Sequence, residues 1–348
     1  MVKQEKNQFL SSFKGSHLYS FCKNFISYPK YFVALCIISI LFSSCDEWFL
    51  IEIENEIAFP QKLTSFELYQ GNISDLNPAD GIFQYDLNTP LFTDYASKQR
   101  LIKLPKQGQM SITDQPVLSF PDSTIIAKTF YYTESENESH KILETRILIK
   151  RDEKWNVGVY QWNEEQNEAF LIKNGADTPI TFYHLGKMIS TEYHIPSNAE
   201  CTTCHNSNRS VSPIGPKLIN LNRNHSQTKG QMNQLEYWKY LDKLNGQLLN
   251  IDGMPNWEDP SYPLSDRARA YLDVNCAHCH NPTGVARDFR LDLSYSTPLY
   301  SSGIPEVGSQ IIYRMESSWE DEKMPKIGTT IQHEEGIELI KKYLNDLN

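Results

Sequence analysis

Cys276-Ala277-His278-Cys279-His280 is the stretch around which this sequence is organised, and its pattern occurs again as Cys201-Thr202-Thr203-Cys204-His205. C-x-x-C-H is the attachment signature of c-type haem. The two thiols form thioether bonds with the haem, and the histidine that follows becomes the proximal iron ligand. We therefore predict two haem c groups, attached through Cys201, Cys204, Cys276 and Cys279, with His205 and His280 as the proximal ligands.

A structural zinc site built from the two C-x-x-C pairs is the alternative interpretation. Such pairs usually lie about 15–20 residues apart and need no histidine directly after the second cysteine. Here positions 205 to 275 separate the pairs, and a histidine follows each of them. The sequence therefore favours haem over zinc, more strongly for the second motif than for the first.

The sixth ligand of each iron decides whether the site carries electrons or binds small molecules. Met324-Pro325 follows His280, and Met254-Pro255 follows His205 at a similar distance. We predict Met324 and Met254 as distal thioether ligands, in a degenerate internal repeat; a surface or core methionine is the alternative for Met324. The other candidates for the first haem are Met232, His225, His194 and His184, whereas His278 and His333 are expected to be solvated.

The N-terminal segment has the pattern of an export signal. Lysines 3, 6, 14, 23 and 30 precede the apolar run Tyr31–Phe42, which Ser43-Ser44-Cys45 follows. The run is too short to span a bilayer but suits the apolar part of a signal peptide, and small residues before a cysteine are similar to a bacterial lipobox. We predict residues 1–44 as a lipoprotein signal peptide, Cys45 as the lipidated first residue and residues 45–62 as an acidic tether; a simple membrane anchor is the alternative.

This prediction places the protein outside the cytoplasm, on the periplasmic side or as an outer-membrane lipoprotein of a Gram-negative bacterium, held to the membrane by its lipid anchor. The formal net charge is −10, and removal of the lysine-rich signal makes it more negative. Such a charge argues against nucleic acid and favours a redox protein with a basic docking surface as donor or acceptor. Cys22 and Cys36 leave with the signal, so no cysteine remains for a disulfide.

The fold expected for the mature chain is multidomain α+β. Residues 63–195 contain strand-like runs rich in β-branched and aromatic residues, which predict a β-rich, sandwich-like domain. The aromatic residues of these runs are expected to lie in its core. The runs are Ser123–Tyr132, Leu143–Arg151, Trp155–Trp162 and Ala169–Ile172, with a hairpin loop at Asp152-Glu153-Lys154.

After Pro196 the pattern becomes helical. Helices are predicted over Thr228–Leu244, Arg267–Asn275 with Ser265 as its cap, and His333–Leu347. A helix, C-x-x-C-H, a long irregular stretch, Met-Pro and a terminal helix are the order of a small class I cytochrome c domain. We therefore assign residues 196–260 to a first haem-binding region and residues 261–348 to a cytochrome c-like domain, in a mainly α haem region.

With these motifs in place, the chain resembles a family of bacterial di-haem c-type cytochromes that carry two C-x-x-C-H motifs behind a β-rich domain in an exported lipoprotein. The resemblance runs from Tyr85–Pro105 through ETRILIKRDEKWNVGVYQWN and CTTCH to RARAYLDVNCAHCHNPTG. It implies a di-haem cytochrome and implies nothing about a pathway. The segment DLNTPLFTDYA within it is expected to be a loop packed against the haem regions.

Three functions are compatible with these observations. The first is extracytoplasmic single-electron transfer through two haems, which needs axial ligation and burial but no acid–base chemistry. The second is a di-haem peroxidase or oxidase with one open haem site. The third is a binding module in the β-rich domain with accessory haems. The sequence favours an electron carrier over an enzyme.

Overall fold

The computed structural model describes residues 59–133, 140–225, 232–248 and 251–347. Phe59–Asn348 forms one compact unit. The predicted signal peptide, the lipidation residue Cys45 and most of the acidic tether lie outside the described residues. No helix in the described part of the chain is long and apolar enough to cross a membrane.

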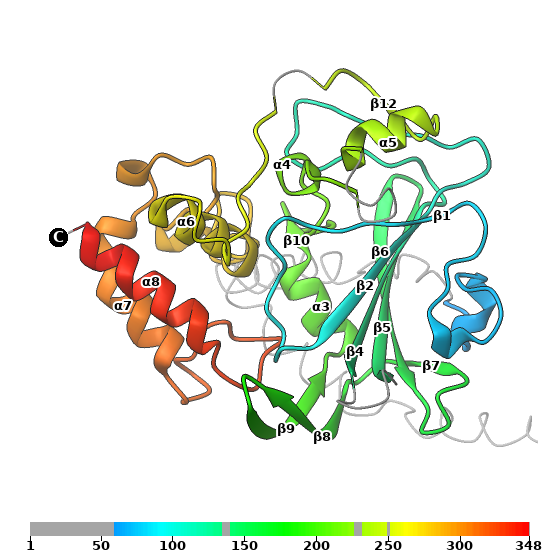
Figure 1. The fold of residues 1–348 in the computed structure, drawn as a ribbon, viewed down its shortest axis with the longest axis horizontal. Helices are drawn as coiled ribbons and strands as arrows, with labels where there is room; N and C mark the ends of the chain where they lie inside the picture. Colours follow the sequence, from blue (N-terminus) through cyan, green and yellow to red (C-terminus); the bar gives the residue numbers. More distant parts are fainter. Residues whose placement is uncertain (1–58, 134–139, 226–231, 249–250, 348) are drawn as a thin grey trace, which may run out of the picture. The chain divides into compact units, whose positions relative to one another are not determined.

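A six-stranded antiparallel sheet forms the β-rich part, and helices follow it in the chain, as the sequence predicted (Figure 1). The strand order is β1-β2-β4-β5-β6-β7. The tight β5–β6 turn falls at Asp152 and Glu153, which both have positive φ, as the predicted hairpin requires. The strands are β1 Ile82–Gln84, β2 Ser97–Lys103, β4 Ile125–Thr133, β5 His140–Arg151, β6 Lys154–Trp162 and β7 Ala169–Ile172.

The two faces of this sheet carry different apolar layers, because successive side chains of a strand point to opposite faces. One face, with Leu101 and Ile147, packs on the short helices η3 (Leu63–Phe66) and η4 (Ile73–Asp75). The other face, with Ile102, packs on the first C-x-x-C-H motif. Tyr160 and Trp162 are buried as expected, whereas Phe170 is exposed.

The second layer differs from the expected sandwich. Among the described residues the remaining strands form only two-stranded pairs, so no second large sheet faces the first. The hairpin β8–β9 and the helix α3 (Asn198–Cys204) cover the sheet instead, because their apolar side chains complete the same core. The pairs are β8 Ala176–His184 with β9 Lys187–Ile195, β10 Asn206–Ser207 with β11 Ser210–Val211, and β3 Met110–Ser111 with β12 Leu244–Asn245.

The helices confirm part of the predicted pattern. The terminal helix α8 (Glu334–Asp346) buries Ile337 and Ile340 and packs with α6 (Leu264–Asn275) and α7 (Ile304–Glu316) around one core. Two expectations were wrong: Ser265 does not cap α6, whose N-cap is Pro263, and α7 occupies part of the stretch expected to be irregular. The remaining helices are α4 Leu218–Leu221, α5 Gln234–Tyr240, η6 Arg287–Phe289 and η7 Leu299–Ser301.

The predicted helix Thr228–Leu244 is shorter in the structure. Its described part begins at Gln234, where the Asn233 side chain accepts a hydrogen bond from the Leu235 N–H. It ends at Tyr240, because Leu244 belongs to β12 and pairs with Met110 of β3.

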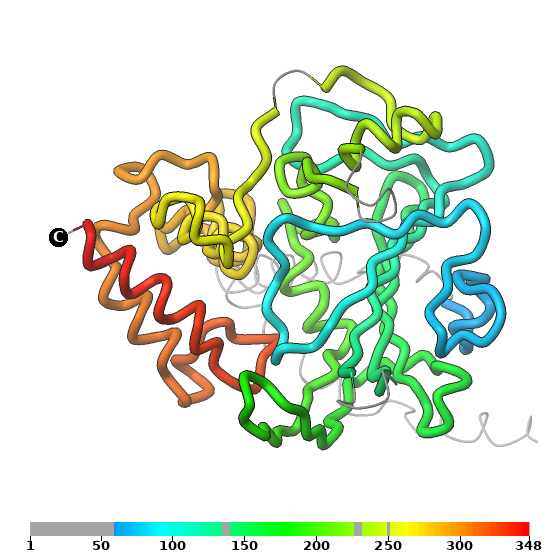
Figure 2. Tube along the Cα trace, in the orientation of Figure 1, coloured from blue at the N-terminus to red at the C-terminus, as the bar shows by residue number. Residues whose placement is uncertain are grey.

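The segment between β1 and β2 contacts the helical part of the chain, as expected for DLNTPLFTDYA. The Thr89 hydroxyl donates to the Pro255 carbonyl at 2.7 Å, and the Phe92 N–H donates to Asn275 Oδ1 at 2.8 Å. Figure 2 shows this cyan segment reaching the orange-red segment before α8, where Asp94 accepts hydrogen bonds. The loop thus connects the sheet to α6 and to the segments before α6 and α8.

We expect Asp94→Ala to lower the free energy of unfolding by about 2–3 kcal/mol, because Asp94 accepts charge-assisted hydrogen bonds that water cannot fully replace. The donors are the Thr330 N–H at 2.9 Å, the Thr330 hydroxyl at 2.8 Å and the Ile331 N–H at 3.2 Å. Urea unfolding measures the change. The exposed Asp114→Ala is the control, and an equal loss in both variants would contradict the bridging role.

Candidate cofactor site

The first C-x-x-C-H motif is positioned by the short helix α3. Ser197 and Glu200 form a capping box, in which each side chain accepts a hydrogen bond from the other residue's backbone N–H at 3.2 and 2.8 Å. Cys201 and Cys204 stand three residues apart and therefore share one face of the helix. Both line a cavity against the sheet, and Cys201 is buried. The S-x-x-E cap is a signal that could have been read from the sequence.

The second motif follows the end of α6 and shares one backbone hydrogen bond with the first. The His205 N–H donates to the Cys201 carbonyl at 2.8 Å, and the His280 N–H donates to the Cys276 carbonyl at 3.0 Å. This hydrogen bond brings the histidine back toward the first cysteine of each motif. The backbones otherwise differ, because Cys201–Cys204 belong to α3, whereas Cys276 ends α6 and turns follow it.

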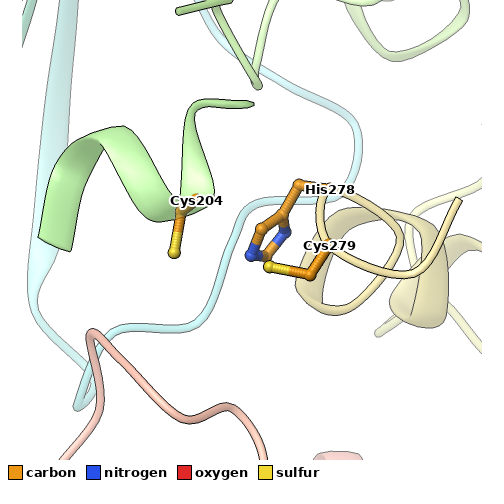
Figure 3. A group of neighbouring side chains, drawn as sticks. All are labelled: Cys204, His278 and Cys279. Atoms are coloured by element: carbon orange, nitrogen blue, oxygen red, sulfur yellow. The ribbon is translucent and has the colours of Figure 1, made fainter. Parts of the chain in front are cut away.

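The two motifs meet at their second cysteines. The ligand atoms of Cys204, His278 and Cys279 all lie within 4.8 Å of one another. Figure 3 shows Cys204 at the end of α3, with the His278 ring and the Cys279 sulfur facing it from the segment after α6. The sequence predicts haem attachment at both cysteines, but it does not indicate that they lie close together.

Hydrogen bonds between the residues after each motif hold this arrangement. The Asn208 N–H donates to the Thr283 carbonyl at 3.0 Å, and the hydroxyls of Ser207 and Thr283 lie 3.1 Å apart. Ser207 lies two residues after His205, and Thr283 lies three residues after His280. The chain therefore joins the two motifs through the segments that leave them.

The four thiols are free, with no disulfide among the described residues. Burial raises the pKa of Cys201 and of Cys276 to about 12. A hydrogen bond with Cys279 raises the pKa of Cys204 and lowers that of Cys279. Cys201, Cys204 and Cys276 are thus held as neutral thiols.

His205 is arranged as a metal-binding imidazole. Its Nδ1–H donates to the Ser212 carbonyl at 2.8 Å, and burial lowers its pKa to about 3. The neutral ring therefore keeps Nε2 unprotonated, which is the usual arrangement of a histidine that binds a metal. His280 is also held neutral, because burial lowers its pKa, but its buried Nδ1 has no hydrogen-bond partner in the described residues.

A cavity of about 120 Å³ lies beside His205, between α3 and the sheet. The side chains of Cys201, Cys204 and His278 line it together with residues of β2, β4 and β5. This volume is smaller than the roughly 300–1,000 Å³ of pockets that hold drug-sized ligands. The thiols and the oriented histidine are residue types that hold a haem, but a haem is larger than this cavity and must displace side chains that now line it.

The predicted distal ligands lie in different surroundings. Met254 is buried against Ala270 and Val274 of α6, and it is not part of the wall of the His205 cavity. Met324 lines a second cavity, of about 580 Å³, and its N–H donates to the Arg314 carbonyl at 2.8 Å. No residue of the second C-x-x-C-H motif lines this second cavity.

The other candidates for the first haem also lie away from the His205 cavity. His194 is held between Asp177 at 2.7 Å and Glu200 at 3.0 Å. His225 packs on Tyr237, and His184 lines the second cavity. None of these histidines, nor Met232, lines the His205 cavity.

The expectation that His278 and His333 are solvated was wrong. His278 lies between the two motifs, as described above. His333 stacks on Phe92 with ring centroids 4.0 Å apart, and the Tyr271 hydroxyl lies 2.9 Å from its Nδ1. Burial lowers the pKa of His333 to about 4, so the ring is neutral. Packing by residues from distant segments, which the local sequence does not show, explains the difference.

A polar cluster in the second cavity was missed by sequence reasoning. Glu335 accepts a hydrogen bond from the Tyr95 hydroxyl at 2.6 Å, and His184 Nε2 lies 2.8 Å from its other oxygen. The Tyr95 and His184 rings stack at 3.7 Å. These residues come from three separate segments and form no local motif, so no sequence signal could have joined them.

No protein-family model, curated protein or solved structure matches this chain. Any assignment of function therefore rests on the residues and the geometry described above.

We expect the second cavity's cluster to make stability depend on pH. His333 has a pKa of about 4 in the folded chain and 6.5 as the ordinary value, so stability falls as pH decreases from 6.5 through 4. Burial alone would raise the pKa of Glu335, but hydrogen bonds from Tyr95 and His184 lower it from 4.5 to about 2. Its contribution is therefore present above pH 4.5 and lost as pH falls through 2.

Urea unfolding across these two windows measures the effect. Glu335→Gln should remove the loss in the lower window. It should also extend the upper window to lower pH, because the Glu335 charge raises the pKa of His333. Glu334→Gln is the matched control, because this neighbouring carboxylate is exposed. Identical pH profiles for the two variants would contradict the assignment to Glu335.

Proposed function

We propose that this chain is a di-haem c-type cytochrome that transfers single electrons outside the cytoplasm. The observation that carries the proposal is the meeting of two C-x-x-C-H motifs, in each of which the histidine N–H donates to the carbonyl of the first cysteine. The ligand atoms of Cys204 and Cys279 lie within 4.8 Å of each other. Two haems attached at these cysteines share one attachment region. The arrangement suits electron exchange between the two haems without a conformational change between electron-transfer steps.

The residues in proposed roles are those of the motifs. Bound haem supplies one-electron chemistry at iron, which the protein tunes through its ligands and through burial. His205 and His280 are the proposed proximal ligands, Met324 and Met254 the proposed distal ones. The helical part of the chain, residues 196–348, is then a cytochrome c-like haem region that packs on the β-rich part.

The second motif is the better placed of the two for exchange with a partner. The ring of Phe289 lies 6.4 Å from the His280 ring and is 76% exposed. The first motif instead packs on the sheet, where Cys201 belongs to the core. A soluble redox protein with a basic surface suits this acidic chain, whose net charge is −10.

The location outside the cytoplasm is part of the proposal. Residues 1–44 would be removed as a lipoprotein signal, and Cys45 would carry the lipid that holds the protein at a membrane. Covalent haem attachment agrees with this location, because c-type haem and lipidated cysteines both follow export.

A zinc site is the competing use of the same sulfurs. Cys204, His278 and Cys279 offer two sulfurs and one nitrogen, which is a donor set that zinc accepts. The two assignments exclude each other, because a thioether bond consumes the thiol that zinc would need. Haem is favoured because it also explains Cys201, Cys276 and the orientation of His205.

We expect the mature chain to carry two covalent haems when it is produced in an exported, haem-attaching compartment. Intact-mass spectrometry should show two haem additions. Cys201→Ala with Cys204→Ala should remove one addition, and Cys276→Ala with Cys279→Ala should remove the other. A mass without haem, together with one zinc per chain by elemental analysis, would replace the haem assignment.

An enzyme is the second candidate function, and the second cavity is the observation that favours it. Its volume of about 580 Å³ is in the range of small-molecule pockets. Glu335 and His333 stand in its wall together with Met324. If Met324 does not bind iron, these groups would lie beside an open haem site and could serve a peroxidase or oxidase.

We expect the unmutated chain not to bind carbon monoxide, because Met254 and Met324 are the proposed sixth ligands; Met254 must then move, since it is not in the wall of the His205 cavity. Met324→Ala should open one haem to carbon monoxide and lower its potential, since a thioether favours ferrous iron. Met188→Ala is the control, because Met188 lines the same cavity but is 65% exposed. Carbon monoxide binding by the unmutated chain, measured by its reduced absorption spectrum, would support the enzyme instead.

A further inference from the structure

A row of three cations crosses the sheet beside the first motif. The strand register places Arg100 of β2 opposite Lys128 of β4, and Lys128 opposite Arg146 of β5. Figure 1 shows these three strands side by side, next to α3. Like charges directly opposite each other destabilise a sheet. Three of them in one row need a compensating anion.

The three cations line the cavity that Cys201, Cys204 and His205 also line, and Lys128 and Arg146 are partly exposed there. Arg100 is buried, and its Nη2 has no hydrogen-bond partner in the described residues. Lys128 lies over the face of Phe130, with Nζ 5.0 Å from the ring centroid. Burial, together with the neighbouring cations, lowers the pKa of Lys128 well below its usual value.

The carboxylates nearby do not balance this row. Glu144 pairs with Arg146, through a hydrogen bond of 2.8 Å to Nε. Glu200, in the cavity wall, is bonded to Ser197 and His194. The charge of Asp86 acts on Arg100, and that of Glu144 acts on Lys128. Neither Arg100 nor Lys128 forms a salt bridge within the described part of the chain.

Asp273, the other carboxylate of the cavity wall, is also engaged. It accepts hydrogen bonds from Lys217 Nζ at 2.7 Å and from the Tyr295 N–H at 3.0 Å. Lys98 stands on the same strand as Arg100, and its Nζ donates to the Ala96 carbonyl at 2.7 Å. Burial, Arg100 and Arg146 lower the pKa of Lys98, while the Asp94 charge raises it. The surroundings of the row thus leave its positive charge in excess.

We propose that Arg100 and Lys128 bind the two propionates of the haem attached to Cys201 and Cys204. This inference rests on the proposed function, because it requires a haem at the first motif. A haem carries two carboxylates, and two cations of the row lack a partner. The β-rich part of the chain is then one wall of the first haem site and sets its electrostatic field.

Redox titration of the haem-loaded full chain tests the proposal. A nearby positive charge favours the less positive, ferrous state, so removing it should lower the potential. Lys128→Met and Arg100→Gln should each lower the potential of the same one of the two haems. Lys128→Arg, which keeps the charge, should restore it. Lys103→Met, on β2 but outside the cavity, is the control and should leave both potentials unchanged.

A second measurement separates propionate binding from a structural role. In the variant Cys201→Ala with Cys204→Ala, the cations face no propionate, so Lys128→Met should raise the urea midpoint by relieving like-charge repulsion. In the haem-loaded chain the same substitution should give no such gain. A gain of equal size in both chains would overturn the proposal.

Two further results would also overturn it. Unchanged potentials in Lys128→Met and Arg100→Gln, with both haems attached, would show that the row does not meet the propionates. A shift of the unmutated chain's potential on addition of inorganic phosphate, absent in Lys128→Met, would show that the row binds a soluble anion. A chain that carries no haem would contradict the proposed function itself. Intact-mass spectrometry detects that outcome independently of the redox titration.

Discussion

The contact between the segments that follow α3 and α6 is the constraint that places the two C-x-x-C-H motifs in one region. It joins two segments that are distant in the chain, through Asn208 and Thr283 and through the approach of Cys204 to Cys279. Without it, each C-x-x-C-H motif would be a separate site with its own surroundings. With it, both motifs share one region, and any group attached to one lies beside the group attached to the other.

The sheet forms one wall of the cavity beside the first motif. Because α3 packs on the sheet, the first motif faces the polar centre of an otherwise apolar sheet face, where Arg100 and Lys128 stand. Burying such charges without partners costs free energy, so their presence points to a group with opposite charge. The loop with Asp94 completes the connection, since it fastens the sheet to the segment that follows Met324.

Much of the local structure could be predicted from the sequence, because it depends on local periodicity. The strand Ala169–Ile172 and the buried face of α8 agree with alternation and with helical spacing. The helix α7 was not predicted, because Pro305 and Gly308 are poor helix formers and interrupt its helical spacing of apolar residues. The row of cations depends on the register between strands, and the meeting of the motifs on long-range packing, so neither could be seen along the chain.

Electron paramagnetic resonance of the oxidised, haem-loaded chain can test whether the two motifs share one region, because two ferric irons held close together perturb each other's signals. The spectrum of the unmutated chain should then differ from the sum of the spectra of the two variants that each lack one pair of attachment cysteines. A spectrum equal to that sum would show that the two haems lie far apart, and would contradict the shared site.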